Sequence, residues 1–463
     1  MKISFHGAAR NVTGSCHLLT CGKTKILVDC GLYQGRNEFN AENDQAFGFE
    51  PSEIDYLLLT HAHLDHCGRI PLLISRGFKG EILTTAATRE LTKLILLDSA
   101  HIQEDDARWM NKRASRRGDN KKPYQPLYTT IDALNSLDYF GRVINYAEPI
   151  QLNANITVSF IEAGHILGSA CVFIELQEGT DKRSVLFSGD LGYSNRAILR
   201  NPAKPPKADV VVMETTYGDR SHKQLEPSIE EMYAAILETF DRGGNVIIPT
   251  FALERAQEIL YFLREGVEKK ILSSAMQVFL DSPMAISATE IFKSHPECYD
   301  KETRDFFNSG KDPFGWPGLH YTKETATSMA LNQIQGGAII LAGSGMCTGG
   351  RVKHHLKHNL WRRNSSVIFV GFAAQGTLAR RIIDGEKAVK IFGDDISVNA
   401  SIYTIGGFSA HADCNELLAW HGQTGNPEKT FLVHGEESAM EAFSASINST
   451  KVLMPTLNEE FNL

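Results

Sequence analysis

The sequence has no C-x-x-C pair among its eight cysteines, no apolar run of about 18 residues and no fixed-period repeat. The first absence excludes a Cys-rich zinc site or a redox dithiol, and scattered cysteines are typical of a reducing compartment. The second excludes a membrane-spanning helix. The N-terminal MKISFHGAARNVTG also lacks the apolar segment of a signal peptide. We therefore expect a cytoplasmic protein without membrane contact, and its 463 residues favour two or three globular domains.

The chain also has little positive charge overall. A net charge of −8 argues against a protein that coats nucleic acid non-specifically, although it allows a nuclease with a local basic surface. Two stretches are basic, namely 108–122 (RWMNKRASRRGDNKK) and 351–363 (RVKHHLKHNLWRR). Each is either a solvated surface or a contact for a phosphate backbone. We expect His354, His355 and His358 to lie on a basic helix surface, because no carboxylate is nearby in the sequence.

Short apolar segments followed by polar or glycine-containing turns predict an α/β fold. Five predicted strands are followed by His, Asp or Glu: 54–60, 184–188, 209–213, 401–405 and 429–433. Open α/β sheets place ligand sites beyond the carboxyl ends of their strands, so these polar residues are candidates for one site. Four further strands predict a separate α/β domain: 245–248, 278–280, 338–341 and 367–370. We expect residues 296–324 to form a long loop within that domain.

The strongest local signal is HAHLDH at residues 61–66. In extended backbone, alternate residues face one side, so His61 and His63 can reach one ion together. Asp65 and His66 follow where the chain turns into a helix, and they can face a second ion. Four such side chains would be costly to bury without a metal, and imidazole and carboxylate suit zinc. The alternative is a polar loop with incidental histidines.

Further ligands are available after other predicted strands. His165 lies in EAGHILGSA, Asp190 in FSGDLG and His434 in VHGE, and each turn contains glycine. Glycine lets the backbone approach a crowded site closely. A single histidine after a strand is more often an ordinary loop residue. Three such positions in glycine-flanked turns favour a shared metal site.

The order HAHLDH, GHILGSA and SGDLG resembles the metal-binding motifs of metallo-β-lactamase fold hydrolases, and VDCGLYQG, with Asp29, resembles the first motif of that fold. METTYGDR, GFSAHAD and VHGE resemble the three additional motifs of the β-CASP RNA-processing nucleases; they contain Glu214, His411 and His434. The likeness extends over nearly the whole chain. It is greatest to short bacterial and archaeal members, which are similar to the cleavage and polyadenylation nuclease subunit and ribonuclease J.

This resemblance implies an α/β fold, a metallo-β-lactamase αββα sandwich with an inserted α/β β-CASP cap domain. The sandwich would comprise residues 1–218 and 398–463, and the cap would comprise 219–397. The resemblance also implies two zinc ions per chain, with Asp29 orienting the histidine loop. His61, His63 and His165 would bind one zinc, Asp65, His66 and His434 the other, and Asp190 would bridge both. Manganese or iron would also suit these ligands.

By the same resemblance, the chain would be a zinc-dependent ribonuclease acting on single-stranded RNA, since a histidine in the last motif accompanies RNA substrates. Cutting would be endonucleolytic, with 5′–3′ exonucleolytic action also open, and would leave 5′-phosphate and 3′-hydroxyl ends. Asp65 and Asp190 would take part in the hydrolysis. His411, oriented by Glu214, would contact the scissile phosphate or protonate the leaving oxygen.

Several alternatives remain at this point. Ser409 could donate to a phosphate oxygen or could cap the following helix. The whole chain could instead be a thioesterase-like hydrolase of small molecules on the same fold, or an inactive RNA-processing subunit. The large predicted cap suits a polymeric substrate better, and the intact ligand positions disfavour an inactive subunit. A homodimer is compatible with the sequence.

Overall fold

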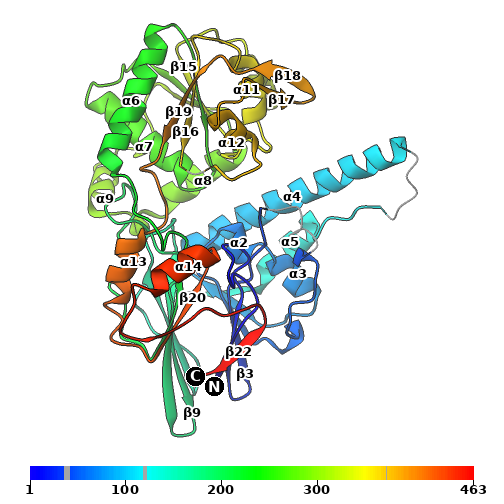
Figure 1. Cartoon of the computed structure of the whole chain (residues 1–463), viewed down its shortest axis with the longest axis vertical. Helices are drawn as coiled ribbons and strands as arrows, with labels where there is room; N and C mark the ends of the chain where they lie inside the picture. Colours follow the sequence, from blue (N-terminus) through cyan, green and yellow to red (C-terminus); the bar gives the residue numbers. More distant parts are fainter. Residues whose placement is uncertain (36–41, 118–122, 372) are drawn as a thin grey trace. The chain divides into compact units, whose positions relative to one another are not determined.

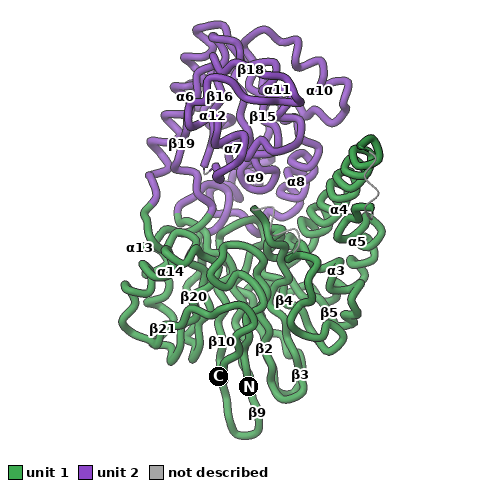
Figure 2. Tube along the Cα trace, turned by 45° about the vertical axis from the view of Figure 1, so that its right-hand side comes forward, with its two compact units in different colours: residues 1–194, 201–221, 411–463 green, residues 195–200, 222–410 purple. Residues whose placement is uncertain are grey.

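The computed structural model describes residues 1–35, 42–117, 123–371 and 373–463. The chain divides into two compact units (Figure 2). Unit 1 comprises residues 1–194, 201–221 and 411–463, and unit 2 comprises 195–200 and 222–410. Among the described residues, no helix combines the length and the apolar character that crossing a bilayer requires.

Unit 1 contains two seven-stranded sheets (Figure 1). The first sheet has the order β22 (Glu459–Asn462), β1 (Lys2–Phe5), β2 (His17–Cys21), β3 (Thr24–Val28), β4 (Tyr56–Leu58), β5 (Glu81–Thr84), β6 (Phe140–Val143). The second has the order β21 (Lys451–Leu453), β20 (Lys429–Val433), β11 (Val210–Glu214), β10 (Asp181–Phe187), β9 (Ala170–Glu178), β8 (Ile156–Glu162), β7 (Ile150–Asn153).

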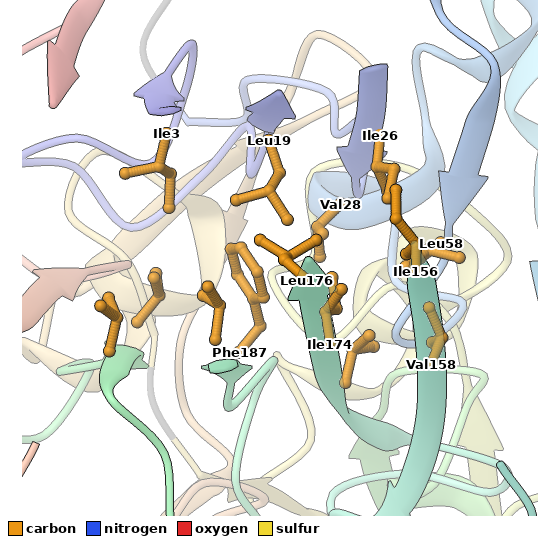
Figure 3. Close-up of a cluster of buried hydrophobic side chains, with 14 of the residues drawn as sticks. Ile3, Leu19, Ile26, Val28, Leu58, Ile156, Val158, Ile174, Leu176 and Phe187 are labelled. Carbon is orange, nitrogen blue, oxygen red and sulfur yellow. The ribbon is translucent and has the colours of Figure 1, made fainter. Parts of the chain in front are cut away.

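The two sheets pack face to face because their strands carry apolar side chains on the facing sides. Figure 3 shows Leu58 from the first sheet and Phe187 from the second within one buried cluster. In β11, Val210 and Val212 join this cluster, whereas Val211 and Met213 join a second cluster on the opposite face. A strand that is apolar on both faces is buried between two layers.

Helices cover the outer faces of both sheets. The second cluster of buried apolar side chains lies between the second sheet and its helices. The helices and 3-10 turns of unit 1 are η1 (Pro51–Glu53), α2 (Leu64–Cys67), α3 (Ile70–Ser75), α4 (Ala86–Arg116), α5 (Thr130–Ser136), η2 (Leu137–Tyr139), α13 (Cys414–His421) and α14 (Glu437–Ser444). Trp420 of α13 and Phe443 of α14 pack on the outer face of the second sheet. Helices α3, α4 and α5 lie on the side of the first sheet (Figures 1 and 2). This αββα arrangement confirms the predicted architecture of unit 1.

Unit 2 is a second α/β layer structure built on one parallel sheet. The sheet has the order β14 (Leu319–Tyr321), β13 (Gln277–Leu280), β15 (Ala338–Ala342), β12 (Val246–Pro249), β16 (Ser366–Val370), β19 (Ser401–Ile405), and a hairpin joins β17 (Ala388–Ile391) to β18 (Asp394–Ser397). Its helices are α6 (Leu225–Asp241), α7 (Arg255–Glu268), α8 (Pro283–Ser294), η3 (Pro296–Cys298), α9 (Lys301–Asn308), α10 (Thr325–Leu331), α11 (Val352–Asn359) and α12 (Leu378–Ile383). Strand–helix alternation of this kind is what a parallel sheet needs for its crossovers.

One feature of unit 2 differs from the sequence-based expectation, and a second bears on the predicted domain limits. Residues 296–324 do not form a long loop, because they contain η3, α9 and β14, and Asp300 caps α9 by accepting a hydrogen bond from the Thr303 N–H at 2.7 Å. Strand β19 hydrogen-bonds in parallel to β16 and belongs to unit 2, whereas the predicted boundary at 397/398 would separate it from the cap. An apolar strand pattern does not reveal which sheet the strand will join. The domain limits 1–218, 219–397 and 398–463 therefore stay a prediction.

His355 corrects the expectation of a basic surface on α11, because its side chain is fully buried. Its Nε2 lies 2.6 Å from Asp281 Oδ2, and Arg351 donates to Asp281 Oδ1 at 2.7 Å. The Ser328 hydroxyl donates to Asp281 Oδ2 at 2.6 Å. The carboxylate partner lies 74 residues away in the sequence, so the residues close to α11 in the sequence do not reveal it.

We expect Asp281→Ala to destabilise unit 2 by about 3 kcal/mol, because it leaves His355 and Arg351 without their shared carboxylate. For a unit of this size the transition should fall by about 6–12 °C. Differential scanning calorimetry measures the change. The control is Asp394→Ala, which removes an exposed partner of Lys357 and should cost at most about 1 kcal/mol. Equal effects of the two substitutions would contradict the role given to Asp281.

Candidate metal centre

The predicted metal-ligating residues of unit 1 come together where strands of both sheets end. His61 and His63 follow β4 of the first sheet, and His63 is the N-cap of α2. Asp65 and His66 therefore lie in the first turn of α2, on a different side from the extended His61–His63 segment. The remaining residues follow or end strands of the second sheet: His165 after β8, Asp190 after β10, Glu214 at the end of β11 and His434 after β20.

The first group consists of His61, His63, His165 and one oxygen of Asp190. His63 Nδ1 lies 3.2 Å from His61 Nε2 and 3.1 Å from His165 Nε2. Asp190 Oδ2 lies 3.4 Å from His61 Nε2 and 3.6 Å from His165 Nε2. Donor atoms about 2.0–2.1 Å from a tetrahedral zinc ion are separated from one another by about 3.3 Å. The four donors therefore fit one zinc ion.

The second group consists of Asp65, His66 and His434, with the other oxygen of Asp190. His434 Nε2 lies 3.3 Å from both His66 Nε2 and Asp65 Oδ2. Asp190 Oδ1 lies 3.3 Å from His66 Nε2, and it has no hydrogen-bond donor within the part of the chain that the structure describes. A buried carboxylate oxygen without a donor fits metal ligation, because an unsatisfied buried charge is otherwise costly. The two oxygens of Asp190 are thus divided between the two groups.

Hydrogen bonds fix which nitrogen of each ring faces these groups. His66 Nδ1 donates to Asp29 Oδ2 at 2.7 Å, and this contact is compatible with the predicted role of Asp29 in orienting the histidine loop. The Thr60 hydroxyl donates to the same oxygen at 2.8 Å, and Thr60 Oγ1 lies 3.0 Å from His61 Nδ1. Thr216 Oγ1 lies 3.0 Å from His434 Nδ1. With Nδ1 carrying the proton in these three rings, Nε2 presents its lone pair to the ligand group, whereas His63 faces its group through Nδ1.

Thr60 and Thr216 are positioning residues that the sequence analysis missed. Each lies at or just beyond a strand end, directly before His61 or shortly after Glu214, and this position was the available signal. Asp29 and His434 adopt left-handed backbone with φ of 61° and 49°. Non-glycine residues rarely adopt such angles, and they concentrate at functional sites.

Burial and charge set the protonation of the site. Burial lowers the pKa of His61 to about 3 and that of His63 to about 4, so both rings are neutral ligands at pH 7. Burial raises the pKa of Asp65, but its contact with His434 and the charges of His66 and His434 together hold that pKa below its usual range. Burial also lowers the pKa of His66, but the Asp190 and Asp29 carboxylates raise it well above 6.5. The pocket therefore attracts positive charge, as a metal centre requires.

Glu214 and His411 form a pair beside these groups. Glu214 is fully buried and accepts a hydrogen bond from the Leu191 N–H at 2.6 Å. His411 Nδ1 lies 3.2 Å from both Glu214 oxygens, and the His411 ring centroid lies 4.5 Å from that of His165. Burial lowers the pKa of His411, but the Glu214 carboxylate raises it to about 9. His411 can therefore hold a proton next to the ligand groups.

Ser409 is the one predicted site residue outside unit 1, since unit 2 ends at residue 410. Its alternative interpretation as a helix cap is wrong. Asp413 caps α13 by accepting hydrogen bonds from the N–H groups of Asn415 at 3.0 Å and Glu416 at 3.1 Å.

The two ligand groups should respond differently to single substitutions. We expect His434→Ala to remove about one metal ion per chain, because it deletes a donor from the second group and leaves the first group complete. Metal content by inductively coupled plasma mass spectrometry measures the effect after dialysis against buffer. His101→Ala removes an exposed histidine of α4 and should leave the metal content unchanged. Retention of the full metal content by His434→Ala would remove His434 from the ligand set.

Comparison with known proteins agrees with this geometry. Residues 9–249 match the metallo-beta-lactamase superfamily, 256–382 the Beta-Casp domain, and 395–455 the Zn-dependent metallo-hydrolase RNA specificity domain. The chain is 40% identical over 442 residues to "Ribonuclease TTHA0252" of Thermus thermophilus, covering 96% of this chain and 95% of that protein. It is 32% identical over 458 residues to "Transcription termination factor FttA" of Methanocaldococcus jannaschii, covering 96% of this chain and 69% of that protein.

Two further similarities extend over whole chains. An "RNase J-like protein" of Methanocaldococcus jannaschii is 29% identical over 454 residues, covering 97% of this chain and 96% of that protein. A crystal structure of a protein of unknown function from Enterococcus faecalis shares the fold, with a TM-score of 0.56 at 14% identity, covering 100% of this chain and 99% of that one. The chain therefore belongs to the metallo-β-lactamase superfamily, in the group whose members carry an inserted β-CASP domain.

Proposed function

We propose that this chain is a zinc-dependent ribonuclease that binds two zinc ions and hydrolyses phosphodiester bonds of single-stranded RNA. The observation that carries this proposal is the division of the two Asp190 oxygens between two ligand groups. It favours two adjacent ions, an arrangement that suits in-line displacement at phosphorus. The match to an RNA specificity domain over 395–455, which includes His411 and His434, favours RNA, as do the ribonuclease names of two relatives.

Each ligand group would hold one zinc ion. One ion would be held by His61, His63, His165 and Asp190, and the other by Asp65, His66, His434 and Asp190. When bound, the ions would supply Lewis-acid activation of water and neutralise the charge that develops on the phosphate. Histidine and carboxylate donors without a thiolate would also accept manganese.

Side chains of the protein would accept and donate the protons of the reaction. Asp65 is ionised at neutral pH and can take a proton from the attacking water. The water oxygen bonds to phosphorus while the bond from phosphorus to the 3′ oxygen breaks, which gives 5′-phosphate and 3′-hydroxyl ends. His411 would give its proton to the departing 3′ oxygen or contact the scissile phosphate, with Glu214 holding the ring. A hydrogen bond from Ser409 to a phosphate oxygen stays a prediction from the sequence.

The central test is cleavage of a 5′-labelled single-stranded RNA beside DNA of the same sequence. Wild type and Asp65→Ala are both loaded with zinc, and metal content is measured in the same samples. We expect wild type alone to cut RNA, with a chelator abolishing the activity. Internal products would indicate endonucleolytic cutting, and stepwise loss from the 5′ end would indicate 5′–3′ exonucleolytic action. Absence of RNA cleavage by zinc-replete wild type, with hydrolysis of thioesters or lactams, would favour the small-molecule alternative instead.

Two further properties belong to the same proposal. We propose a cytoplasmic location, since all eight cysteines are free thiols and seven of them are buried, which suits a reducing compartment. A homodimer stays a prediction from the sequence, and light scattering of the zinc-loaded protein would check it.

A further inference from the structure

The carboxyl-terminal part of α4 extends beyond the packed body of unit 1 (Figures 1 and 2). Its last buried residue is Ala107, and the described residues after it, 108–117, are exposed or half-buried. We call residues 108–117 the basic arm, because they contain five Lys or Arg residues and no Asp or Glu. The last turns of this 31-residue helix contain no fully buried residue, so hydrophobic burial stabilises them little. Their composition therefore suggests a role other than packing.

Four of the five cations of the basic arm lie on one side of the helix. At about 100° per residue, Arg108, Trp109, Lys112, Arg113 and Arg116 fall within about 140° of the helix circumference. Trp109 lies in the middle of this sector and is 59% exposed. The Arg113 guanidinium lies 5.2 Å from the Trp109 ring centroid. An exposed indole among cations is an arrangement that binds single-stranded nucleic acid, because bases stack on the ring and phosphates pair with the cations.

The opposite side of the arm faces the protein. Asn111 lies there, and its side chain donates to the Tyr124 carbonyl at 2.9 Å and accepts from the Tyr124 N–H at 2.8 Å. This pair of hydrogen bonds fixes the rotation of the helix relative to the segment that follows it. The sector around Trp109 is therefore directed away from that segment of unit 1.

The charges of the basic arm are largely uncompensated, and fewer of them are paired than in the other basic stretch. Among the described residues, only Arg108 of the arm pairs with a carboxylate, that of Asp105. In the stretch 351–363, by contrast, Arg351 pairs with the buried Asp281 and Lys357 with Asp394. The two stretches look alike in the sequence, and the tertiary structure leaves more unpaired positive charge on the first one.

The arm is connected rigidly to the metal centre through α4. The hydroxyls of Thr85 and Thr88, at the start of the helix, donate to the Gly168 carbonyl at 2.7 and 2.8 Å, and Gly168 follows His165 by three residues. From Thr88 to Trp109 the helix rises 21 residues, or about 31 Å at about 1.5 Å per residue. This length corresponds to about nine nucleotides at the stacked spacing of about 3.4 Å.

We propose that the basic arm is a second RNA-binding surface, which holds the substrate strand about nine nucleotides away from the bond being cut. A base stacks on Trp109, and neighbouring phosphates pair with Lys112, Arg113 and Arg116. This inference rests on the proposed ribonuclease function. Single-stranded RNA fits better than an anionic membrane, because the sector carries only one large apolar side chain and cannot bury an apolar face in lipid.

The test compares RNA substrates of two lengths in the zinc-loaded enzyme. The variant Lys112→Gln/Arg113→Gln/Arg116→Gln keeps good helix formers and removes three charges. We expect kcat/KM for an RNA of about 24 nucleotides to fall at least about tenfold, mostly through KM, while that for an RNA of about 6 nucleotides stays unchanged. Trp109→Ala should weaken binding of the longer RNA by about fivefold. Circular dichroism checks that α4 stays helical.

Binding measurements separate this proposal from the proposed function. Fluorescence anisotropy with the longer RNA in the presence of chelator needs no cleavage, and the triple variant should lower the slope of log affinity against log salt by about 2. The matched control is Lys23→Gln/Lys182→Gln/Lys207→Gln, at exposed positions of unit 1 outside α4, which should leave affinity and slope unchanged. Equal RNA affinity of the arm variant and wild type would overturn the proposal. So would tighter binding of wild type to phosphatidylserine vesicles than to RNA.

Discussion

Replacing Asp190 by Asn is expected to lower the metal content of both ligand groups and to reduce kcat/KM for RNA by at least about 10⁴-fold. The substitution keeps the size of the side chain but removes the negative charge that both groups share. One oxygen becomes an amide nitrogen, which cannot ligate a cation, so at least one group loses a donor outright. The remaining amide oxygen is also a weaker ligand for zinc than a carboxylate.

Metal analysis and single-turnover cleavage measured on the same preparation test this expectation. The matched control is Asp209→Asn, which makes the same chemical change just before β11, at the end of that strand opposite Glu214. Asp209 accepts hydrogen bonds from Ser184 and touches no residue of the ligand groups. An Asp190→Asn enzyme that retains two ions and most of its activity would show that Asp190 does not bridge.

The second large effect is expected for substitution of His411, which should lower activity without lowering the metal content. We expect His411→Ala to lower kcat by about 10²–10⁴-fold, the range for loss of a general acid, while both metal ions stay bound. The reason is that His411 Nδ1 is bound to Glu214 and the ring lies beside the ligand groups without belonging to them. His320→Ala, at an exposed position in unit 2, serves as the control.

The pH profile distinguishes proton donation from a purely structural role of His411. The Glu214 charge raises the pKa of His411, so a required proton is lost as pH rises through that pKa. Glu214→Gln keeps a hydrogen-bond acceptor but removes the charge. The basic limb of the kcat profile should therefore move to lower pH in Glu214→Gln. An unchanged basic limb, with reduced kcat at all pH values, would leave Glu214 as a positioning residue only.

The sequence predicted the local backbone structure around the candidate site well, because this structure depends on neighbouring residues. HAHLDH places two ligands on extended backbone and two on the first turn of a helix, and the structure has His63 as the cap between them. Apolar runs followed by polar turns located β10, β11 and β20 to within a few residues. These predictions needed only strand and helix periodicity and the position of a strand end.

Predictions failed where the partner of a residue lies far away in the chain. His355 was expected on the surface, yet it is buried against Asp281. Strand β19 was predicted as a strand, but its apolar pattern could not indicate that it pairs with β16. Thr60 and Thr216 are common residue types, and only their contacts with His61 and His434 give them a role.

By itself, the sequence determined the donor types of the candidate metal centre and the α/β class, because both follow from residue chemistry and short-range periodicity. Only the tertiary structure decided how the donors divide into two groups, with one Asp190 oxygen directed toward each. The reason is that these donors follow strands of two different sheets, whose ends meet only in the folded protein. It also decided that distant carboxylates pair with two cations of the basic stretch 351–363, Arg351 and Lys357, whereas in 108–117 only Arg108 has a carboxylate partner among the described residues. Long-range contacts of this kind are set by packing, which no local pattern encodes.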